Sequence, residues 1–355
     1  MNLEELRREI DKIDTQIVSL ISERMKTVKD IGLEKEKLGK QIEDAKREGT
    51  VLEHVKHIAR KESINEEYIE SIYKQIVTIS RNMQGTMIAF QGELGAYGEE
   101  AALQFFGPSI HVKPCESLDD VFKIVEMGTS QFGVVPIENS LEGSISRVYD
   151  LLLDSNLKVY GETELKISHC LIANPGAQVG SINKVYSHPQ ALAQCRAFLK
   201  HLDCELIPTY NTAASVKMIK DKDIKDGAAV ASARAADIYG MQIIATEIED
   251  NPSNFTRFFI LSTHDAPPTR NGKTSIVFSV KHKPGTLYEF LQTLASKKIN
   301  LTKIESRPTR QKPWEYNFYL DFEGHREDKL SKEILDSLEQ VSIFVKILGS
   351  YPKAK

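Results

Sequence analysis

The chain contains no long hydrophobic run and little cysteine. No stretch of its 355 residues is apolar enough to span a bilayer, so no membrane-spanning helix is expected. The first residues are charged from Glu4 onward, which is not typical of a signal peptide. The cysteines show neither metal-ligand nor redox spacing, so reduced and mostly buried thiols are expected at Cys115, Cys170, Cys195 and Cys204.

The sequence also lacks a strong charge of one sign. A net charge of −4 gives no bias toward nucleic acid or a membrane surface as a partner, and we expect neither. The helical pattern stops at residues 84–85, and a turn-rich stretch at 265–272 marks a second break. These features predict a cytoplasmic metabolic enzyme with three domains, at 1–85, 86–265 and 272–355.

The first segment has the apolar periodicity of one long helix. Apolar residues recur at three- and four-residue steps, at Leu6, Ile10, Ile13, Ile17, Leu20, Val28 and Ile31. A helix from about Leu3 to Ile31, or as far as Leu38, is roughly 50 Å long. A bundle made from residues 1–85 alone cannot cover such a rod, so we expect two copies to form an intertwined dimer.

Two cations interrupt this apolar stripe. Arg24 and Lys35 both occupy steps where an apolar residue is expected. Because a buried unpaired charge costs several kcal/mol or more, something anionic is expected to pair with them. Local acids such as Glu34 or Asp44 are one possibility. With two cations on one stripe, we favour a site for an anionic ligand.

Further polar residues follow at helical spacing. Asp44, Arg47 and Glu48 fall at i, i+3 and i+4 and therefore share a face. Ser80 and Gln84 lie one turn apart along the edge of a later helix. The set contains no evident nucleophile–base pair and no metal cluster. It suits a dianionic substrate whose reaction needs shape and electrostatics rather than covalent help.

Residues 1–84 resemble the all-helical chorismate mutase domain that occurs fused to prephenate dehydratase. The motifs LRREIDKID, ISERM, GLEK, EDAKRE and SRNMQ carry the resemblance. It implies roles for eight residues, one of which, Arg7, would come from the other subunit. The implied carboxylate ligands are Arg7, Arg24 and Arg47, and the residues at the ether oxygen are Lys35 and Gln84. Glu48 would bind the ring hydroxyl, and Asp44 and Ser80 would complete the shell of the site.

Residues 87–265 alternate short apolar runs with helical stretches, which is typical of an α/β fold. Strands are expected at Met87–Gln91, Phe132–Ile137, Lys184–Ser187, Ala228–Ala231, Ile243–Glu247 and Phe258–Leu261. The expected helices include Leu118–Glu126, Pro189–His201 and Ala213–Lys220.

Three polar clusters sit at the ends of these elements, where open α/β sheets bind ligands. The glycine-rich turn at 92–98 leads into a helix, and its backbone N–H groups suit a carboxylate, although structural turns of this kind are common. The other two clusters are residues 136–143 and 251–258. Polar residues packed this densely after an apolar strand favour a binding site over a purely structural role.

This segment resembles prephenate dehydratase over nearly its whole length, through GELGAYG, PIENSLEGSI, SHPQAL, TAAS, AAVASARAADIYG and NPSNFTRF. The resemblance implies two α/β lobes around a cleft, similar to periplasmic binding proteins. It also implies a catalytic Thr256 that assists departure of the ring hydroxyl by hydrogen bonding. His188 either belongs to the cleft or only caps the following helix. The other residues implied to line the cleft are Glu138, Asn139, Ser140 and Arg257.

The last segment, 272–355, has the order strand, helix, strand, strand, helix, strand, as in split βαβ ferredoxin-like folds. It resembles the ACT regulatory domain through Pro284-Gly-Thr-Leu287 and Glu305-Ser-Arg-Pro308. The resemblance implies phenylalanine bound between two such domains. A dimerisation module that has lost its ligand is the alternative. The implied effector residues are Gly285, Thr286, Leu287, Glu305, Ser306, Arg307 and Pro308.

Together, the resemblances predict a bifunctional enzyme of phenylalanine biosynthesis. Its substrates would be chorismate and prephenate, its effector phenylalanine and its assembly a homodimer or homotetramer, with no organic cofactor and no metal. Two alternatives remain: a monofunctional dehydratase whose helical domain only dimerises the chain, and a nonenzymatic sensor.

Overall fold

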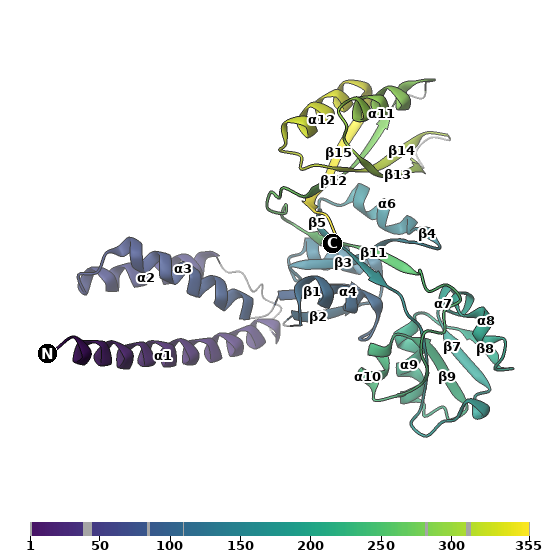
Figure 1. The fold of residues 1–355 in the computed structure, drawn as a ribbon, viewed down its shortest axis with the longest axis horizontal. Coiled ribbons are helices and arrows are strands. Elements are labelled where there is room, and N and C mark those ends of the chain that lie inside the picture. Colours follow the sequence, from purple (N-terminus) through teal and green to yellow (C-terminus); the bar gives the residue numbers. More distant parts are fainter. Residues whose placement is uncertain are drawn as a thin grey trace. The chain divides into compact units, whose positions relative to one another are not determined.

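The computed structural model describes residues 2–37, 45–83, 86–108, 110–280, 283–309 and 314–354. The chain divides into two compact units, one holding residues up to 87 together with 109–111, and one holding the rest (Figure 1). The expected fold class is confirmed, with an all-helical segment, a two-lobed α/β segment and an α+β segment of ferredoxin-like order. None of the described helices is both long and apolar enough to cross a membrane.

The helical unit contains α1 (Leu3–Lys37), α2 (Ala45–Lys61) and α3 (Glu66–Met83). The long α1 confirms the helix that the apolar stripe predicts. Helix α3 packs against both of the others. Few side chains are buried among the described residues of this unit, namely Met25, Val28, Val55, Ala59 and Ser80.

The N-terminal half of α1 keeps its apolar stripe uncovered in the single chain. Leu6, Ile10 and Ile17 are 45%, 57% and 48% exposed. Ile72 and Ile79 on α3 are likewise exposed. An apolar surface of this extent is unfavourable in water, so it is a face that another molecule would cover.

The first α/β lobe is a mixed sheet with strand order β2-β1-β3-β11-β5, to which β4 adds beside β3. Strand β3 is parallel to β1, whereas β11 is antiparallel to both of its neighbours. The strands are β1 (Thr86–Gln91), β2 (Ile110–Cys115), β3 (Phe132–Asn139), β4 (Gly143–Ser144), β5 (Lys158–Lys166) and β11 (Phe255–Ser262). The helices are α4 (Tyr97–Phe106), α5 (Leu118–Glu126) and α6 (Ser146–Asp154).

The second lobe is a sheet of order β10-β6-β9-β7-β8 with its own apolar core. The single helix expected at 189–201 is two helices, because the backbone turns at the buried Cys195. The strands are β6 (Cys170–Ala173), β7 (Lys184–Ser187), β8 (Glu205–Pro208), β9 (Gly227–Ala231) and β10 (Gln242–Ala245). The helices are α7 (Pro189–Gln194), α8 (Arg196–Leu199), α9 (Thr212–Asp221) and α10 (Ala233–Tyr239), with a 3-10 turn at Val179–Ser181.

The C-terminal domain is a four-stranded antiparallel sheet of order β13-β14-β12-β15 that packs against two helices. This order confirms the expected ferredoxin-like arrangement. Its elements are β12 (Gly272–Val280), α11 (Thr286–Ser296), β13 (Leu301–Pro308), β14 (Tyr316–Glu323), α12 (Lys329–Val341) and β15 (Ser342–Pro352).

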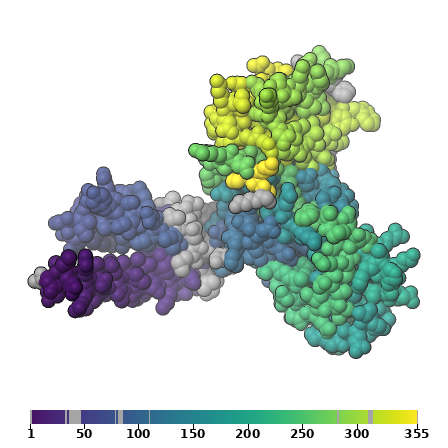
Figure 2. Space-filling model, in the orientation of Figure 1, coloured from purple at the N-terminus to yellow at the C-terminus, as the bar shows by residue number. Residues whose placement is uncertain are grey.

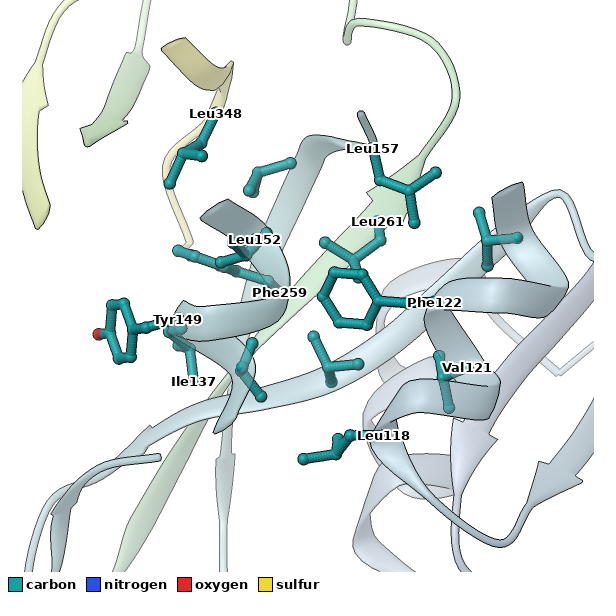
Figure 3. Close-up of a cluster of buried hydrophobic side chains, with 14 of the residues drawn as sticks. Leu118, Val121, Phe122, Ile137, Tyr149, Leu152, Leu157, Phe259, Leu261 and Leu348 are labelled. Atoms are coloured by element: carbon teal, nitrogen blue, oxygen red, sulfur yellow. The ribbon is translucent and has the colours of Figure 1, made fainter. Parts of the chain in front are cut away.

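One apolar core runs from the first lobe into the C-terminal domain (Figure 3). Leu348 packs in the same cluster as Leu152 and Phe259 of the lobe. Gly349 comes so close to β5 that an added Cβ would lie 2.2 Å from the carbonyl oxygen of Val159. The C-terminal domain is therefore built onto this lobe, and the two also lie in direct contact in the space-filling view (Figure 2).

Candidate functional site

A pocket of about 210 Å³ lies between the two α/β lobes. Asn139 and Thr256 line it from the first lobe, and Gln194 and Asn211 line it from the second. The glycine-rich turn and the start of α4 also contribute to the wall. The pocket thus brings together all three polar clusters that the sequence places at strand ends.

Thr256 and Asn139 meet because β11 runs antiparallel to β3, which pairs the two residues in register. Asn139 Nδ2 donates hydrogen bonds to Thr256 Oγ1 (3.0 Å) and Asn254 Oδ1 (2.7 Å). Both pocket residues are buried. Because Thr256 Oγ1 accepts from Asn139, its own proton remains available to donate to a ligand in the pocket.

His169 is a pocket residue that the sequence analysis did not single out. Its Nδ1 lies 2.9 Å from the Tyr97 hydroxyl, and its Nε2 lies 3.1 Å from Gln194 Oε1. Burial lowers the pKa of His169, which favours a neutral ring. Gln194 Oε1 also accepts from Asn254 Nδ2 (2.9 Å), so hydrogen bonds connect Tyr97 with Thr256 across the pocket. No motif spacing in the sequence points to His169.

His188 has both of the roles that the sequence left open. Its Nδ1 accepts from the backbone N–H of Gln190 (3.3 Å), which caps α7, and its side chain also lines the pocket. Burial lowers the pKa of His188 as well. Ser140 is not among the pocket-lining residues. Its hydroxyl donates to the carbonyl of Ser253 (3.0 Å) and accepts from the N–H of Phe255 (2.9 Å), which fastens the loop after β3 to the start of β11.

Glu138 and Arg257, which were also expected in the cleft, lie on the other face of the sheet. They are the neighbours of Asn139 and Thr256 on the same strands, and successive side chains of a strand point to opposite faces. Arg257 forms ion pairs with Glu138 (2.7 Å) and with Glu162 (2.9 Å) of β5. These two predicted residues therefore face the C-terminal domain rather than the pocket.

In the described part of the helical unit, a hydrogen bond joins two of the predicted mutase residues, Arg24 and Ser80. Arg24 Nη1 donates to Ser80 Oγ, and the buried Ser80 in turn donates to the carbonyl of Ile76 (2.6 Å). Lys35 on α1 and Glu48 on α2 are half-buried, whereas Arg7 and Arg47 are exposed. Asp44 and Gln84 lie outside the described residues.

A second cavity, of about 490 Å³, lies beside the start of α11. Thr286, Leu287, Asn317 and Phe318 are among its lining residues. Gly285 has φ +91°, a left-handed conformation that favours glycine. Asn317 is buried, and its Oδ1 has no hydrogen-bond partner within the described part of the chain. A buried acceptor without a partner is costly, and a hydrogen-bond donor that reached Asn317 Oδ1 would relieve this cost.

The four predicted effector residues of β13 divide between the two sides of the strand. Glu305 Oε2 accepts from Ser144 Oγ (2.9 Å), and Arg307 Nη1 donates to Ser146 Oγ (2.6 Å). Both contacts reach the first lobe. Ser306 and Pro308 are exposed, as expected for the alternate positions of a strand.

The described residues contain no cluster of three or more histidine, cysteine, aspartate or glutamate side chains that would hold a metal ion. The four cysteines are free, and three of them are buried. Burial raises the pKa of the Cys195 thiol, which keeps it protonated and unreactive.

Three protein-family models match the chain in sequence. They are chorismate mutase type II at residues 6–85, prephenate dehydratase at 88–266 and the ACT domain at 274–340. A bifunctional chorismate mutase/prephenate dehydratase of Aquifex aeolicus (strain VF5) is 39% identical, over 99% of this chain and 98% of its own length.

Two solved structures resemble about three quarters of the chain. The prephenate dehydratase of Arthrobacter aurescens in complex with L-Phe is 32% identical with a TM-score of 0.70, covering 75% of this chain and 90% of that one. GqqA, described as a novel type of quorum quenching acylase, is 33% identical with a TM-score of 0.70, covering 75% of this chain and 98% of its own. The match over the full length of the Aquifex relative shows that this chain belongs to the family of bifunctional chorismate mutase/prephenate dehydratases.

Proposed function

We propose that the pocket between the α/β lobes converts prephenate to phenylpyruvate, with Thr256 as the catalytic group. In this reaction the bond between the ring and its carboxylate breaks, and the carboxylate leaves as CO2. The electron pair of that bond enters the ring, and the ring hydroxyl departs and takes a proton from solvent to become water. One observation supports this proposal most strongly. The Thr256 hydroxyl accepts a hydrogen bond from Asn139, so its own proton can form a hydrogen bond with the substrate. Because threonine is a weak acid, it assists by hydrogen bonding rather than full proton transfer. Formation of the aromatic ring drives the step.

The helical unit is proposed to rearrange chorismate to prephenate. Arg24 and Lys35 would bind the anionic substrate and the ether oxygen on which charge develops, without covalent chemistry. The uncovered apolar stripe of α1 supports an intertwined dimer, in which Arg7 of a second copy would complete the site. A homodimer or a larger homo-oligomer meets this requirement.

The effector proposed for the C-terminal domain is phenylalanine, the amino acid named in the Arthrobacter complex. Its ammonium group would donate to the unpartnered Asn317 Oδ1, while Leu287 and Phe318 offer apolar contact to its ring. Feedback inhibition follows if the ligand binds two states of the domain with different affinity. We further propose that the enzyme acts in the cytoplasm with no nucleic-acid or membrane partner.

A coupled assay on the full chain tests this function. Chorismate and prephenate are supplied separately, and phenylpyruvate is measured with and without phenylalanine. We expect product from both substrates and inhibition by phenylalanine. A monofunctional dehydratase would use prephenate only, and a nonenzymatic sensor would bind phenylalanine and convert neither substrate.

A further inference from the structure

Two neighbouring strands each place a pocket residue beside a residue of the interface with the C-terminal domain. On β11 the pair is Thr256 and Arg257, and on β3 it is Asn139 and Glu138. The register between the two strands shifts immediately after Arg257. Such an irregularity is common where a strand must aim a particular side chain. Any displacement of Arg257 along or across β11 is therefore a displacement of Thr256.

On the interface side, six charged residues form a mostly buried cluster of three cations and three anions. Glu138, Glu162 and Arg257 come from the first lobe, and Lys273, Lys303 and Asp321 come from the C-terminal domain. Glu162 pairs with Arg257 (2.9 Å) and with Lys273 (2.6 Å). Arg257 pairs with Glu138 (2.7 Å) and with Asp321, and Lys303 pairs with Glu138. The side chains of Arg257 and Asp321 are only 8% and 7% exposed.

Opposite charges favour the ionised forms of Glu138 and Arg257 in this cluster, although both side chains are taken out of water. Burial alone would raise the pKa of Glu138, but the hydrogen bond from Lys303 and the charge of Arg257 hold it below its usual value. Burial alone would lower the pKa of Arg257, but the Asp321 carboxylate raises it. Removing one partner of such a buried set leaves another charge without compensation, so the two domains are held in one relative position.

Strand β14 connects this cluster to the cavity beside α11. Asn317 and Asp321 lie four residues apart on β14 and therefore point to the same face, about 13 Å from each other. Tyr319, between them, is buried against the first lobe and donates to the carbonyl of Tyr149 (2.8 Å). One face of one strand thus carries a cavity-lining acceptor at one end and the partner of Arg257 at the other.

We propose that Arg257 is a positioning residue for the dehydration, through which the C-terminal domain sets the place of the Thr256 hydroxyl. A ligand in the cavity beside Asn317 acts on turnover by shifting β14, and Asp321 transmits the shift to Arg257. The inference rests on the proposed role of Thr256. It adds to that role the path by which effector binding changes the position of the catalytic group.

The test uses the full chain and two variants of the cluster, Asp321→Asn and Lys303→Met. The matched control is Arg326→Met. It removes an exposed ion pair with Asp265 (2.8 Å), which also joins the C-terminal domain to the preceding segment but lies outside the cluster. For each protein, kcat and KM for prephenate are measured, together with the phenylalanine concentration that halves the rate and the melting temperature.

We expect Asp321→Asn to lower kcat about tenfold or more, to leave KM within about twofold and to raise the half-inhibiting phenylalanine concentration about tenfold. Lys303→Met should act in the same direction and more weakly, and Arg326→Met should match the wild type. Wild-type kcat and phenylalanine response in Asp321→Asn would overturn the inference, as would an equal loss in Arg326→Met or an effect on KM alone.

If Asp321→Asn does not fold, Lys303→Met decides by the same readouts. Lys303 lies on the adjacent β13 and is less buried than Asp321, with a side chain that is 14% exposed. A wild-type chain that fails to convert prephenate would contradict the proposed function itself. That result is distinct from failure of this inference, which requires an active wild type.

Discussion

The side-chain amide of Asn139 donates to the hydroxyl of Thr256 across two antiparallel strands, at 3.0 Å. The orientation of this amide is fixed, because Asn139 Oδ1 accepts from the backbone N–H groups of Leu141 (3.0 Å) and Glu142 (3.1 Å). Asn139 can therefore only donate to Thr256. The Thr256 hydroxyl is therefore held in a donor role toward the pocket before any substrate arrives.

Replacing Thr256 by valine keeps the side-chain volume and removes the hydroxyl. We expect kcat for prephenate to fall about 10²–10³-fold, the usual loss for one preorganised donor, while prephenate binding changes less. Steady-state kinetics and equilibrium binding of prephenate measure the two effects separately. A variant that retained half of the wild-type turnover would exclude Thr256 as the catalytic group.

Asn139→Asp is predicted to reverse the direction of the hydrogen bond between residue 139 and the Thr256 hydroxyl. An ionised aspartate only accepts hydrogen bonds, so Thr256 would donate to it instead of to the substrate. We expect kcat to fall at least about tenfold at neutral pH and to recover partly as pH is lowered toward the carboxyl pKa. A rate at neutral pH equal to that of the wild type would show that the direction of this hydrogen bond does not matter.

The apolar stripe of α1 predicts how the chain assembles. Ile10→Asp combined with Ile17→Asp places charges on the stripe, and we expect the oligomer to dissociate and mutase activity to be lost. Lys12→Asp is the control, because Lys12 lies on the opposite face of the same helix. Sedimentation velocity reports the assembly. An unchanged oligomer in the double variant would mean that α1 does not form the interface.

Burial of His169 predicts a pH dependence of stability. Its folded-state pKa is lowered from the ordinary value of about 6.5, so the fold favours the neutral ring. The stabilisation is complete above about pH 6.5 and is lost as pH falls below that value, by at most about 1.4 kcal/mol per pH unit. Urea unfolding at several pH values measures this slope.

His169→Gln should flatten that slope only in part, because the half-buried His188 also has a lowered pKa and contributes with the same sign. If the slope between pH 6.5 and 5 were identical in the wild type and the variant, His169 would not be the titrating group.

The sequence predicted those elements whose burial follows a simple period. Strand β9 is a continuous apolar run, β3 is one up to Ile137, β7 alternates in burial, and α1 follows the stripe of the first segment. Strand β5 escaped notice because it carries charged residues along its length, among them Glu162. That carboxylate is buried only because Arg257 and Lys273 pair with it from other strands. No local sequence pattern predicts ion pairs of this kind between distant strands.

The site residues likewise include some that sequence motifs placed correctly and some that they did not. Thr256 and Asn139 were predicted from motifs, and the register of β11 with β3 brings them together. Arg257 was assigned to the cleft because it adjoins Thr256 in the sequence, yet adjacent positions of a strand face opposite ways. The turn-rich segment at 265–272 was interpreted as a break between domains, but Leu348 and Tyr351 of β15 pack in one core with residues of the first lobe. Long-range packing of this kind is not visible in a local pattern.

We propose that one chain carries two separate active sites, and two variants with two measured activities decide whether it does. Lys35→Ala should lower mutase turnover about 10²–10³-fold, because it removes a cation that meets charge developing on the ether oxygen. Chorismate consumption and phenylpyruvate formation from prephenate are measured for Lys35→Ala and Thr256→Val side by side. We expect each variant to lose one activity and to keep the other near the wild-type rate. Loss of both activities in either folded variant would contradict it.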